Sequence, residues 1–591
     1  MTLASLLRAP ATERVVLVLL TLAIVALRVR LAVSDGGATL FFDEAYYIEN
    51  ARAMFALGPY STAHYPPLYS LLLVPGLAVD SWYSATMAIS AAASALTVPA
   101  GWFLARSVGL RAPLLAALAI GMLTSAFAYA TFLMSENLST PIFVVAVALA
   151  VRARAREGWV LGVAAAALVL TKYLFLPVAA ILLVGYLVLR HRAEPHRPAG
   201  ARAREIGLVF AGPVVGATLW LVYSLGSGMT LFQSVGLTDP SSTFERSVAE
   251  GDAGGLVLWI AVYLAALILP ALPTVFLGIA FLSRRRAAGA RLDRTQRALA
   301  ILTAVVAATA VAVAVQHSFG APYNYPEPQL AWPRYLVHLG PIAIVVGLVL
   351  LQALTSTATR AVRIPVVLAA LAATGGVAGL SWWFLFREGS GIIAWGFTAP
   401  ITAADLFPFR SAGTFALALA ICGVVAAILV VPVARRRAVA LGALALTALL
   451  AVPTFGYLDR AVPSDSYLGD TSDVGGATMR KMIDVIADDA VRDPSTVFVL
   501  GDGVAIARPY WQLRFWDLGP DEIQTPTFDE LGLEFPVRDA TATAEFLASI
   551  RALAGCSAPG DVCYLVTRTP LPVPGRTDER WGETLVFTRV P

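Results

Sequence analysis

Long apolar segments with almost no charge follow one another along most of this chain. The first runs from Val15 to about Val33, and the next strong one from about Ala85 to Ala105. A helix of about 20 apolar residues crosses the hydrocarbon core of a bilayer. Because 58% of the 591 residues are hydrophobic and only 14% are charged, a soluble enzyme is excluded. The chain is predicted to be a polytopic α-helical membrane protein.

Similar segments recur to about residue 455, which predicts about thirteen transmembrane helices in all. No small-residue cleavage site follows the first segment, so it is predicted to be an anchor and not a removed signal peptide. A shorter apolar piece, Leu68 to Leu77, is too short to cross and is expected to lie along the membrane surface. The remaining predicted spans lie roughly at 113–133, 139–151, 159–171, 174–189, 206–224, 256–282, 298–315, 335–353, 364–385, 413–433 and 438–455.

Arginine-rich connections between the spans alternate with connections that contain few arginines. The positive-inside rule places the basic connections in the cytoplasm, which puts the N-terminus inside and the C-terminal tail outside. The acids Asp43 and Glu136, the loop with Asp239 and Glu245, and Arg334 then all fall on the outer face. The basic connections hold Arg106 and Arg111, Arg152 to Arg156, Arg190 to Arg204, Arg284 to Arg297, Arg360 and Arg363, and Arg435 to Arg437.

The choice of basic residues indicates the source and excludes one class of partner. Of 43 basic residues only Lys172 and Lys481 are lysine, which is typical of a GC-rich bacterial genome such as an actinobacterial one. The predicted location is therefore the bacterial plasma (inner) membrane. The arginines lie between hydrophobic spans and not in a patch interleaved with aromatics, so nucleic-acid binding has no support.

The composition changes after the last span. Residues 1–456 form the predicted transmembrane domain, and residues 457–591 are ordinary soluble sequence with a helix-like segment at 476–490. We predict a small extracytoplasmic α/β domain. Its short β-rich runs lie at 496–500, 562–567 and 584–590.

Two of the three cysteines lie in this tail. Cys556 and Cys563 flank a Ser-Ala-Pro-Gly turn, and an oxidising compartment favours a disulfide between them over two unrelated thiols. Cys422 lies inside a span, where a small packing residue is the simplest interpretation.

The first outer loop, about residues 34–84, carries the sequence Phe42-Asp43-Glu44-Ala45-Tyr46-Tyr47. Two carboxylates beside a membrane are costly unless something uses them. Apolar residues recur at helical spacing from Glu44 to Leu57, with Gly58-Pro59 as a stop, which predicts a short amphipathic helix. Asp43 would stand at its N-cap and could serve only the backbone N–H groups there. For Glu44, a solvated helix start is the simpler interpretation.

A second outer acid, Glu136, lies in Met134-Ser135-Glu136-Asn137 between two closely spaced spans. A lone glutamate at the interface needs a partner or water, so a role in a site is one interpretation. An ordinary helix start with an exposed Glu136 is the other, because Pro141 follows. If Asp43 and Glu136 converge, their oxygens could share a divalent cation.

Basic and aromatic groups on the same face complete the candidate set. Lys172 ends its span in Leu170-Thr171-Lys172, where it could contact phosphate or only extend its ammonium to the interface. Arg334 lies in Trp332-Pro333-Arg334-Tyr335, against the usual inside bias, which favours a functional role. His64 precedes Tyr65-Pro66-Pro67 and could be a contact or a loop residue.

The order of these motifs resembles the lipid-carrier-dependent membrane glycosyltransferases called GT-C. The order is Phe42-Asp43-Glu44-Ala45-Tyr46-Tyr47, Tyr65-Pro66-Pro67-Leu68, Ser135-Glu136-Asn137, Leu170-Thr171-Lys172 and Pro333-Arg334-Tyr335. It is most similar to the branch with the protein O-mannosyltransferases and the aminoarabinose transferase of lipid A. His64 departs from the aminoarabinose branch, whose members usually have lysine there.

The resemblance implies transfer of a sugar, with inversion, from a polyprenyl-phosphate donor to a hydroxyl of a cell-wall glycan, glycolipid or protein. It implies no nucleotide cofactor. Asp43 would be the catalytic base, and a divalent cation on Asp43 and Glu136 is a further expectation. Two other classes stay open, namely a transporter or flippase of lipid-linked sugars and a non-catalytic receptor or scaffold. The substrate-binding residues would be Glu44, His64, Tyr65, Glu136, Lys172, Arg334 and Tyr335.

Overall fold

The chain divides into two compact units, which we describe separately. Residues 1–33 and 50–458 form the first, and residues 34–49 and 459–591 form the second. The predicted domain boundary after residue 456 lies outside the described residues. The computed structural model describes residues 10–34, 42–60, 65–234, 253–268, 271–288, 291–319, 336–355, 360–386, 422–430 and 437–448, together with five strands between 495 and 590.

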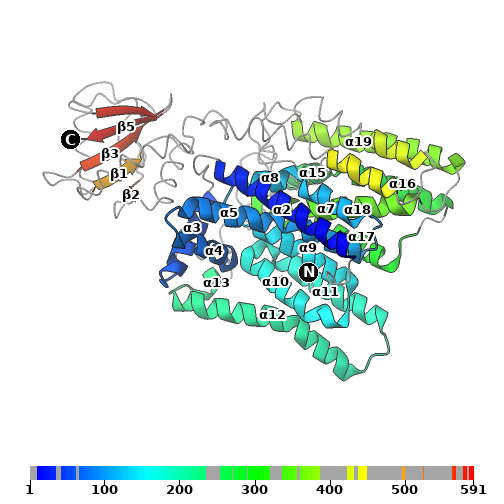
Figure 1. Cartoon of the computed structure of the whole chain (residues 1–591), viewed down its shortest axis with the longest axis horizontal. Helices are drawn as coiled ribbons and strands as arrows, with labels where there is room; N and C mark the ends of the chain where they lie inside the picture. Colours follow the sequence, from blue (N-terminus) through cyan, green and yellow to red (C-terminus); the bar gives the residue numbers. More distant parts are fainter. Residues whose placement is uncertain are drawn as a thin grey trace. The chain divides into compact units, whose positions relative to one another are not determined.

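Helices make up nearly all of the described residues before the tail (Figure 1). Unlabelled helical segments also occupy 422–430 and 437–448. The labelled helices are α2 (Ala11–Ser34), α3 (Phe42–Phe55), α4 (Pro67–Leu73), η1 (Val74–Ala78), α5 (Trp82–Ala95), α6 (Thr97–Ser107), α7 (Pro113–Gly121), α8 (Thr124–Ala130), α9 (Glu136–Arg152), η2 (Ala155–Glu157), α10 (Gly158–Thr171), η3 (Tyr173–Phe175), α11 (Leu176–Ala193), α12 (Ala199–Gly226), α13 (Leu231–Ser234), α15 (Ala253–Ile268), α16 (Leu272–Ala288), α17 (Arg294–Phe319), α18 (Leu339–Leu354) and α19 (Arg360–Phe386).

Six of the described helices are long and apolar enough to cross a membrane, and a bent pair, α15 with α16, would make a seventh span. This confirms a multi-pass membrane protein. Each predicted span contains a described helix, but the count of thirteen is not confirmed, because several of these helices are short or broken. The predicted span at 113–133 consists of α7 and α8 with a break between them, and that at 256–282 consists of α15 and α16. The six are Ala11–Val33, Trp82–Ser107, Tyr173–Ala193, Ala199–Gly226, Arg294–Gln316 and Ile364–Ser381.

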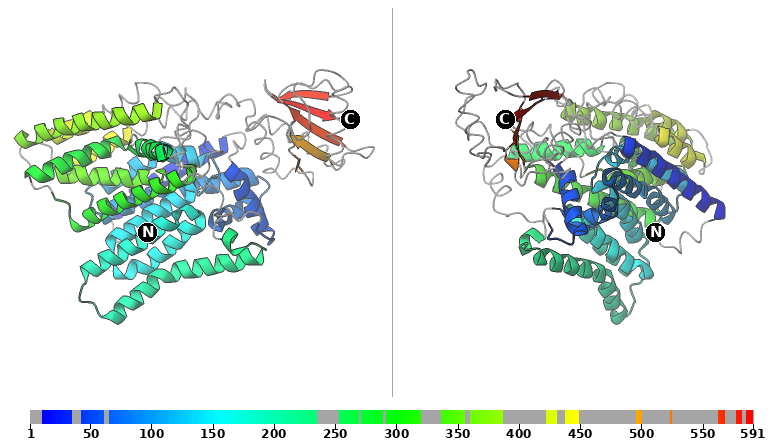
Figure 2. Two further views of the ribbon diagram at one scale, coloured as in Figure 1. Left: turned by 180° about the vertical axis from the view of Figure 1, so that it is seen from behind. Right: turned by 60° about the vertical axis from the view of Figure 1, so that its left-hand side comes forward.

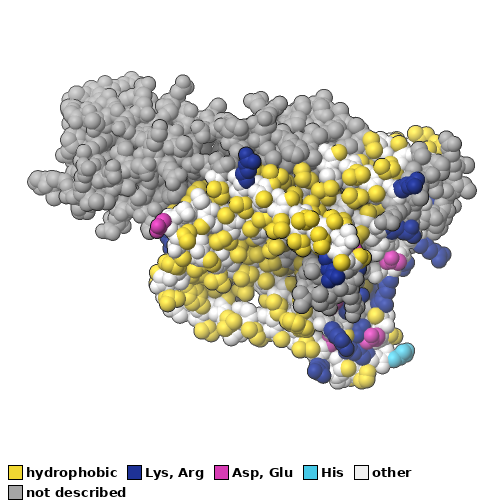
Figure 3. Space-filling view, viewed as in Figure 1, with side chains coloured by type: hydrophobic (Ala, Val, Ile, Leu, Met, Phe, Trp, Pro, Cys, Tyr) yellow, Lys and Arg dark blue, Asp and Glu magenta, His cyan; other side chains and the backbone are white. Residues whose placement is uncertain are grey.

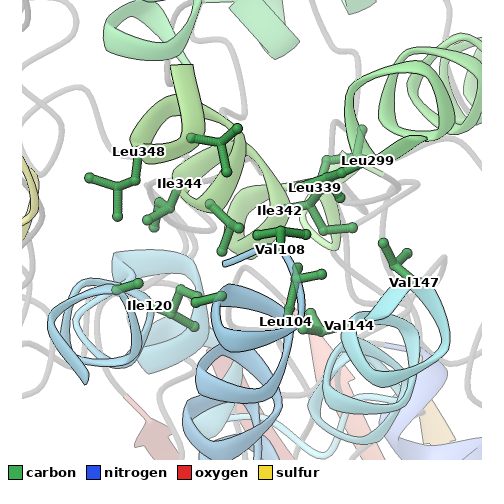
Figure 4. Close-up of a cluster of buried hydrophobic side chains, with 14 of the residues drawn as sticks. Leu104, Val108, Ile120, Val144, Val147, Leu299, Leu339, Ile342, Ile344 and Leu348 are labelled. Atoms are coloured by element: carbon green, nitrogen blue, oxygen red, sulfur yellow. The ribbon is translucent and has the colours of Figure 1, made fainter. Parts of the chain in front are cut away.

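The apolar core lies where α6, α7 and α9 meet α17 and α18 (Figure 4). From behind, green helices lie along the cyan helices (Figure 2), and α17 contacts α9 and α11. Leu104 and Val144 from the first group meet Leu339 and Ile342 of α18. This packing holds the start of α18 beside the start of α9, which positions the candidate site described below.

Helices α10 and α12 approach each other through glycines. A Cβ atom added to Gly162 of α10 would lie 2.1 Å from the carbonyl oxygen of Val209, and one added to Gly212 of α12 would lie 2.6 Å from the carbonyl carbon of Gly162. Both obstacles are backbone atoms, which cannot rotate away as a side chain can. Only glycine at these two positions therefore permits the close contact.

A fully buried arginine in α2 holds the break between α7 and α8. Arg28 donates hydrogen bonds to the carbonyl oxygen of Gly121 (2.9 Å) and to Ser94 Oγ (3.1 Å), and its guanidinium lies 5.0 Å from the ring centre of Phe127. The carbonyl groups at a helix end lack partners within the helix. Arg28 supplies one such partner within the helix bundle.

The helix predicted in the first outer loop is present as α3, but its apolar residues are not gathered on one face, so the prediction of an amphipathic helix is wrong. Tyr47, Ile48 and Ala51 are buried, whereas Phe55 is 53% exposed. The helix ends at the predicted stop, where the Gly58 N–H donates to the Ala53 carbonyl (2.8 Å). The apolar piece that follows is short, as predicted, and it forms α4 and the 3₁₀ helix η1. Its position along the membrane surface stays a prediction.

Five strands in the tail form one mixed sheet in the order β2-β1-β3-β5-β4. Strand β1 is parallel to β2 and β3, whereas β5 is antiparallel to β3 and β4. Three strands lie where β-rich runs were expected. The predicted helix at 476–490 lies outside the described residues, so the α/β class stays a prediction. The strands are β1 (Ser495–Val499), β2 (Ile523–Gln524), β3 (Val562–Thr567), β4 (Thr577–Trp581) and β5 (Leu585–Val590).

Candidate functional site

The end of α10 and the start of α9 bring two opposite charges together inside the protein. Glu136 is the first residue of α9, and Lys172 directly follows the last residue of α10. Lys172 Nζ donates to Glu136 Oε1, and Ser135 Oγ lies 3.3 Å from Glu136 Oε2. The Glu136 side chain is only 1% exposed and that of Lys172 is 10% exposed. The expectation of an exposed Glu136 at an ordinary helix start is therefore wrong.

The two helices favour this pair electrostatically. A carboxylate at a helix N-terminus and an ammonium at a helix C-terminus each oppose the helix dipole, and each contributes about 0.3–1 kcal/mol in ordinary settings. Desolvation of two charges costs several kcal/mol per ion, so a buried pair is weak grounds for stability. A pair retained despite this cost suggests a use for its charges.

Asn137, next to Glu136, connects three elements. Its Nδ2 atom lies within hydrogen-bonding distance of Ser90 Oγ (2.8 Å) in α5 and of the carbonyl oxygens of Tyr129 (2.7 Å) and Phe132 (2.9 Å). Ser90 in turn contacts the hydroxyl of Tyr69 (2.6 Å), in α4. The loop that leads into α9 is therefore fixed, and Glu136 is positioned with it.

A histidine from the start of α18 reaches the same helix end. His338 Nε2 lies 2.8 Å from Ser139 Oγ, and Ser139 Oγ donates to the Ser135 carbonyl oxygen (2.9 Å). A serine hydroxyl has one hydrogen, so the hydrogen between Ser139 and His338 belongs to Nε2. The imidazole ring lies edge-on against Phe175, with ring centres 4.6 Å apart.

Two small cavities adjoin the ion pair. One of about 30 Å³ is lined by Lys172 and by apolar groups that include Phe143, Phe175 and Val178. The other, of about 20 Å³, is lined by Glu136 together with polar side chains. Each has room for about one water molecule. The cavity on the lysine side is lined mainly by apolar residues, whereas the cavity on the glutamate side has a mixed lining. Besides Glu136, its polar residues are Ser94, Thr97, Ser125, Tyr129, Asn137 and Thr140.

The structure places only part of the predicted site. Asp43 is the second residue of α3, but its side chain is not among those described. Glu44 is 2% exposed, which contradicts the expected solvated helix start. Tyr65 accepts a hydrogen bond at its carbonyl oxygen from the Tyr60 hydroxyl (2.8 Å).

Other predicted features fall outside the described residues. They are His64, Arg334, Tyr335 and the disulfide between Cys556 and Cys563. Cys422 is fully buried, as expected of a packing residue.

The predicted divalent cation on Asp43 and Glu136 stays a prediction, because the side chain of Asp43 is not among those described. A metal-binding carboxylate presents its oxygens to the cation, whereas the oxygens of Glu136 face the ammonium of Lys172 and the hydroxyl of Ser135. Among the described residues no group of three or more His, Cys, Asp or Glu side chains could hold a metal ion. We therefore derive no step through a metal.

Sequence reasoning missed three parts of this site. Asn137 and Ser139 were given no role in the predicted site, although both lie within three residues of Glu136. His338 was not considered, although it is one of only five histidines in the chain and follows the Pro333-Arg334-Tyr335 motif closely. The rarity of histidine in this chain was the sequence feature that could have marked His338 as a candidate.

Comparisons with known proteins point to one fold. No protein-family model matches the chain, and no curated protein sequence matches it. Among solved structures, it is similar to ArnT from Cupriavidus metallidurans bound to undecaprenyl phosphate, with a TM-score of 0.53, 16% identity and 98% of each chain covered. The same protein in the apo state matches with a TM-score of 0.50, 16% identity and 97% of each chain covered. The chain therefore shares the fold of these structures over nearly its whole length.

Proposed function

We propose that this chain is an inverting glycosyltransferase of the outer face of a bacterial plasma membrane. It moves a sugar from a polyprenyl-phosphate donor to a hydroxyl group of a cell-wall glycan, a glycolipid or a protein. The fold that it shares with ArnT supports the class, since one of those structures contains undecaprenyl phosphate. The shared fold does not identify the sugar or the acceptor.

The buried Glu136–Lys172 pair beside an apolar cavity is the observation that carries the proposal. A polyprenyl phosphate has a charged group joined directly to an apolar chain. The Lys172 ammonium could bind the phosphate, and the adjoining cavity lined by Phe143, Phe175 and Val178 could accept the start of the apolar chain. Because that cavity is small in this structure, donor binding requires side chains to move and the phosphate to replace Glu136 as the partner of Lys172.

The proposed reaction needs one base and a cationic site for the leaving group. The Asp43 carboxylate takes the proton of the acceptor hydroxyl. The acceptor oxygen forms a bond to the anomeric carbon while the bond from that carbon to the phosphate oxygen breaks, with inversion. The electron pair leaves with the phosphate, which Lys172 and Arg334 stabilise. A phosphate leaving group needs no proton donor, in contrast to the two-carboxylate chemistry of glycoside hydrolysis.

The remaining predicted residues have supporting roles in the proposal. Glu136 holds Lys172 before the donor arrives and then faces the sugar hydroxyls from its cavity. Glu44, His64, Tyr65 and Tyr335 contact the substrates from the outer loops.

The test is turnover of a panel of purified polyprenyl-phosphate sugars by the wild type and by Asp43→Asn. We expect Asp43→Asn to abolish transfer while the variant keeps its fold and binds the donor. The matched control is Asp80→Asn, which removes an exposed carboxylate from the same predicted outer loop and should leave turnover unchanged. A fully active Asp43→Asn variant would remove this carboxylate from the mechanism.

A further inference from the structure

A pocket larger than the two cavities beside the ion pair lies far from them, where α11 ends and α12 begins. Its volume is about 320 Å³, at the lower end of the range for small-molecule sites. Lys172 precedes the first turn of α11, whereas Arg190 lies in its last turn. The length of α11, about 25 Å at about 1.5 Å per residue, therefore separates the two sites.

Basic groups outnumber acidic ones in this pocket. Its lining includes Arg190, Arg192, Arg197 and Arg202 but only two carboxylates, Glu194 and Glu205. Figure 3 shows charged side chains gathered at this end of the helices, next to a broad apolar surface. The lining thus carries an excess of two positive charges, before any contribution from the lining residue His191.

Some of these charged side chains form hydrogen bonds that stabilise the connection between α11 and α12, and we call this set of contacts the brace. Arg190 Nη2 donates to Glu194 Oε2 (2.6 Å), and Arg190 Nε donates to Glu205 Oε1 (3.3 Å). Arg197 donates to Glu205, which also accepts a hydrogen bond from the Tyr186 hydroxyl (2.7 Å). The two carboxylates are therefore already occupied by Arg190, Arg197 and Tyr186.

Two arginines of the pocket, Arg192 and Arg202, take no part in the brace. Within the described part of the chain, neither Arg192 nor Arg202 forms an ion pair. Arg202 donates one Nη2 hydrogen bond to the Pro195 carbonyl oxygen, and its buried Nε has no hydrogen-bond partner there. Both guanidinium groups can therefore donate to a ligand without breaking the brace.

The rim of the pocket is apolar and faces outward. Val188 is 45% exposed and Ile206 is 46% exposed, and both line the pocket. Only 11% of the apolar window of α12 is buried within the protein, so most of this helix is available to lipid. Guanidinium groups next to an exposed apolar rim at the end of membrane-spanning helices match a phosphate headgroup with its acyl chains.

We propose that this pocket binds a phosphate group at the arginine-rich face of the membrane domain, which the positive-inside rule places in the cytoplasm. Two sources carry this chemistry, the headgroup of an anionic lipid and free inorganic phosphate. The apolar rim favours the lipid. The site is separate from the proposed transferase site, so it can be tested without measuring sugar transfer.

The test measures binding to the purified full-length chain in a neutral detergent at fixed salt. Three probes are titrated: dioctanoyl phosphatidylglycerol, dioctanoyl phosphatidylcholine and inorganic phosphate. The pocket variant is Arg192→Gln/Arg202→Gln, which spares the brace. The control is Arg156→Gln/Arg204→Gln, which removes the same charge from exposed arginines outside the pocket lining. Circular dichroism and gel filtration check that each variant is folded.

We expect phosphatidylglycerol to bind the wild type and the control alike, and the pocket variant at least tenfold more weakly, with phosphatidylcholine binding weakly to all three. Inorganic phosphate that binds as well as the lipid, with the same dependence on Arg192 and Arg202, would support the phosphate site and identify the free anion as the source. Equal loss in both double variants would show a general charge effect and overturn the proposal. Binding that the pocket variant retains, or no binding of either phosphate probe to the wild type, would also overturn it.

Discussion

Removal of the ammonium from the buried ion pair should destabilise the protein in a manner that depends on pH. In Lys172→Met the apolar length of the side chain is kept, while Glu136, with its side chain 1% exposed, loses the cation. A buried carboxyl group that loses a positively charged neighbour is shifted toward its protonated form. The loss of stability then follows from the free energy needed to keep Glu136 protonated at the pH of the experiment.

An isolated glutamic acid titrates near pH 4.3, and each pH unit above this adds about 1.36 kcal/mol to the cost of keeping it protonated. At pH 7 the cost is about 3.7 kcal/mol, which agrees with the range of about 3–5 kcal/mol for removing one partner of a buried pair. The folded variant would hold a proton that its unfolded chain releases, so falling pH favours the folded state. The lost stability should therefore return at about 1.4 kcal/mol per pH unit as the pH falls toward about 4.5.

The assay is unfolding of the purified chain by sodium dodecyl sulfate in mixed micelles between pH 5 and pH 8. The double variant Glu136→Gln/Lys172→Met should recover most of the loss and show no such slope, because it buries no lone charge. The control is Arg106→Met, whose partner Glu13 is 2.8 Å away in a pair with side chains 33% and 17% exposed; a loss below about 1 kcal/mol is expected there. A Lys172→Met variant whose stability does not change with pH would refute the reasoning, since Glu136 would then stay ionised after the loss of the Lys172 ammonium.

Three further substitutions test the packing around the site, each measured by the same unfolding assay against the wild type. Gly162→Ala should cost at least about 1–3 kcal/mol because the new methyl group meets the Val209 carbonyl at 2.1 Å, whereas Gly207→Ala in α12, with nothing within 4 Å, should be neutral or stabilising by up to about 1 kcal/mol; equal effects would refute the close approach. Asn137→Ala should cost about 1–3 kcal/mol because the Tyr129 and Phe132 carbonyls lose a donor, and an unchanged stability would show that these contacts are dispensable. Arg28→Met should cost a similar amount, about 1–3 kcal/mol, through the Gly121 carbonyl, and a stabilised variant would show that desolvation of the arginine outweighs its hydrogen bonds.

The sequence pattern predicted the helices well, because helix formation depends mainly on residues that are close together in the sequence. The apolar segments and the stop at Gly58 specify helices and their ends because hydrophobic length and backbone freedom act over a few residues. The same reasoning was wrong about Glu44, which is buried because exposure depends on contacts with residues far apart in the chain. The break between α7 and α8 was also missed, since the Gly121 carbonyl is stabilised by Arg28, 93 residues away in the chain.

The lengths of the apolar segments already identify a multi-pass membrane protein, and the motifs between them name Glu136 and Lys172 as candidate site residues. Their meeting depends on the tertiary structure, because close packing of α9 against α10 brings these two helix ends together and no short-range pattern encodes which helix ends become neighbours. The roles of Asn137 and His338 emerged in the same way. Hydrophobic periodicity is written into each segment, but the pairing of buried charges depends on contacts between segments far apart in the chain.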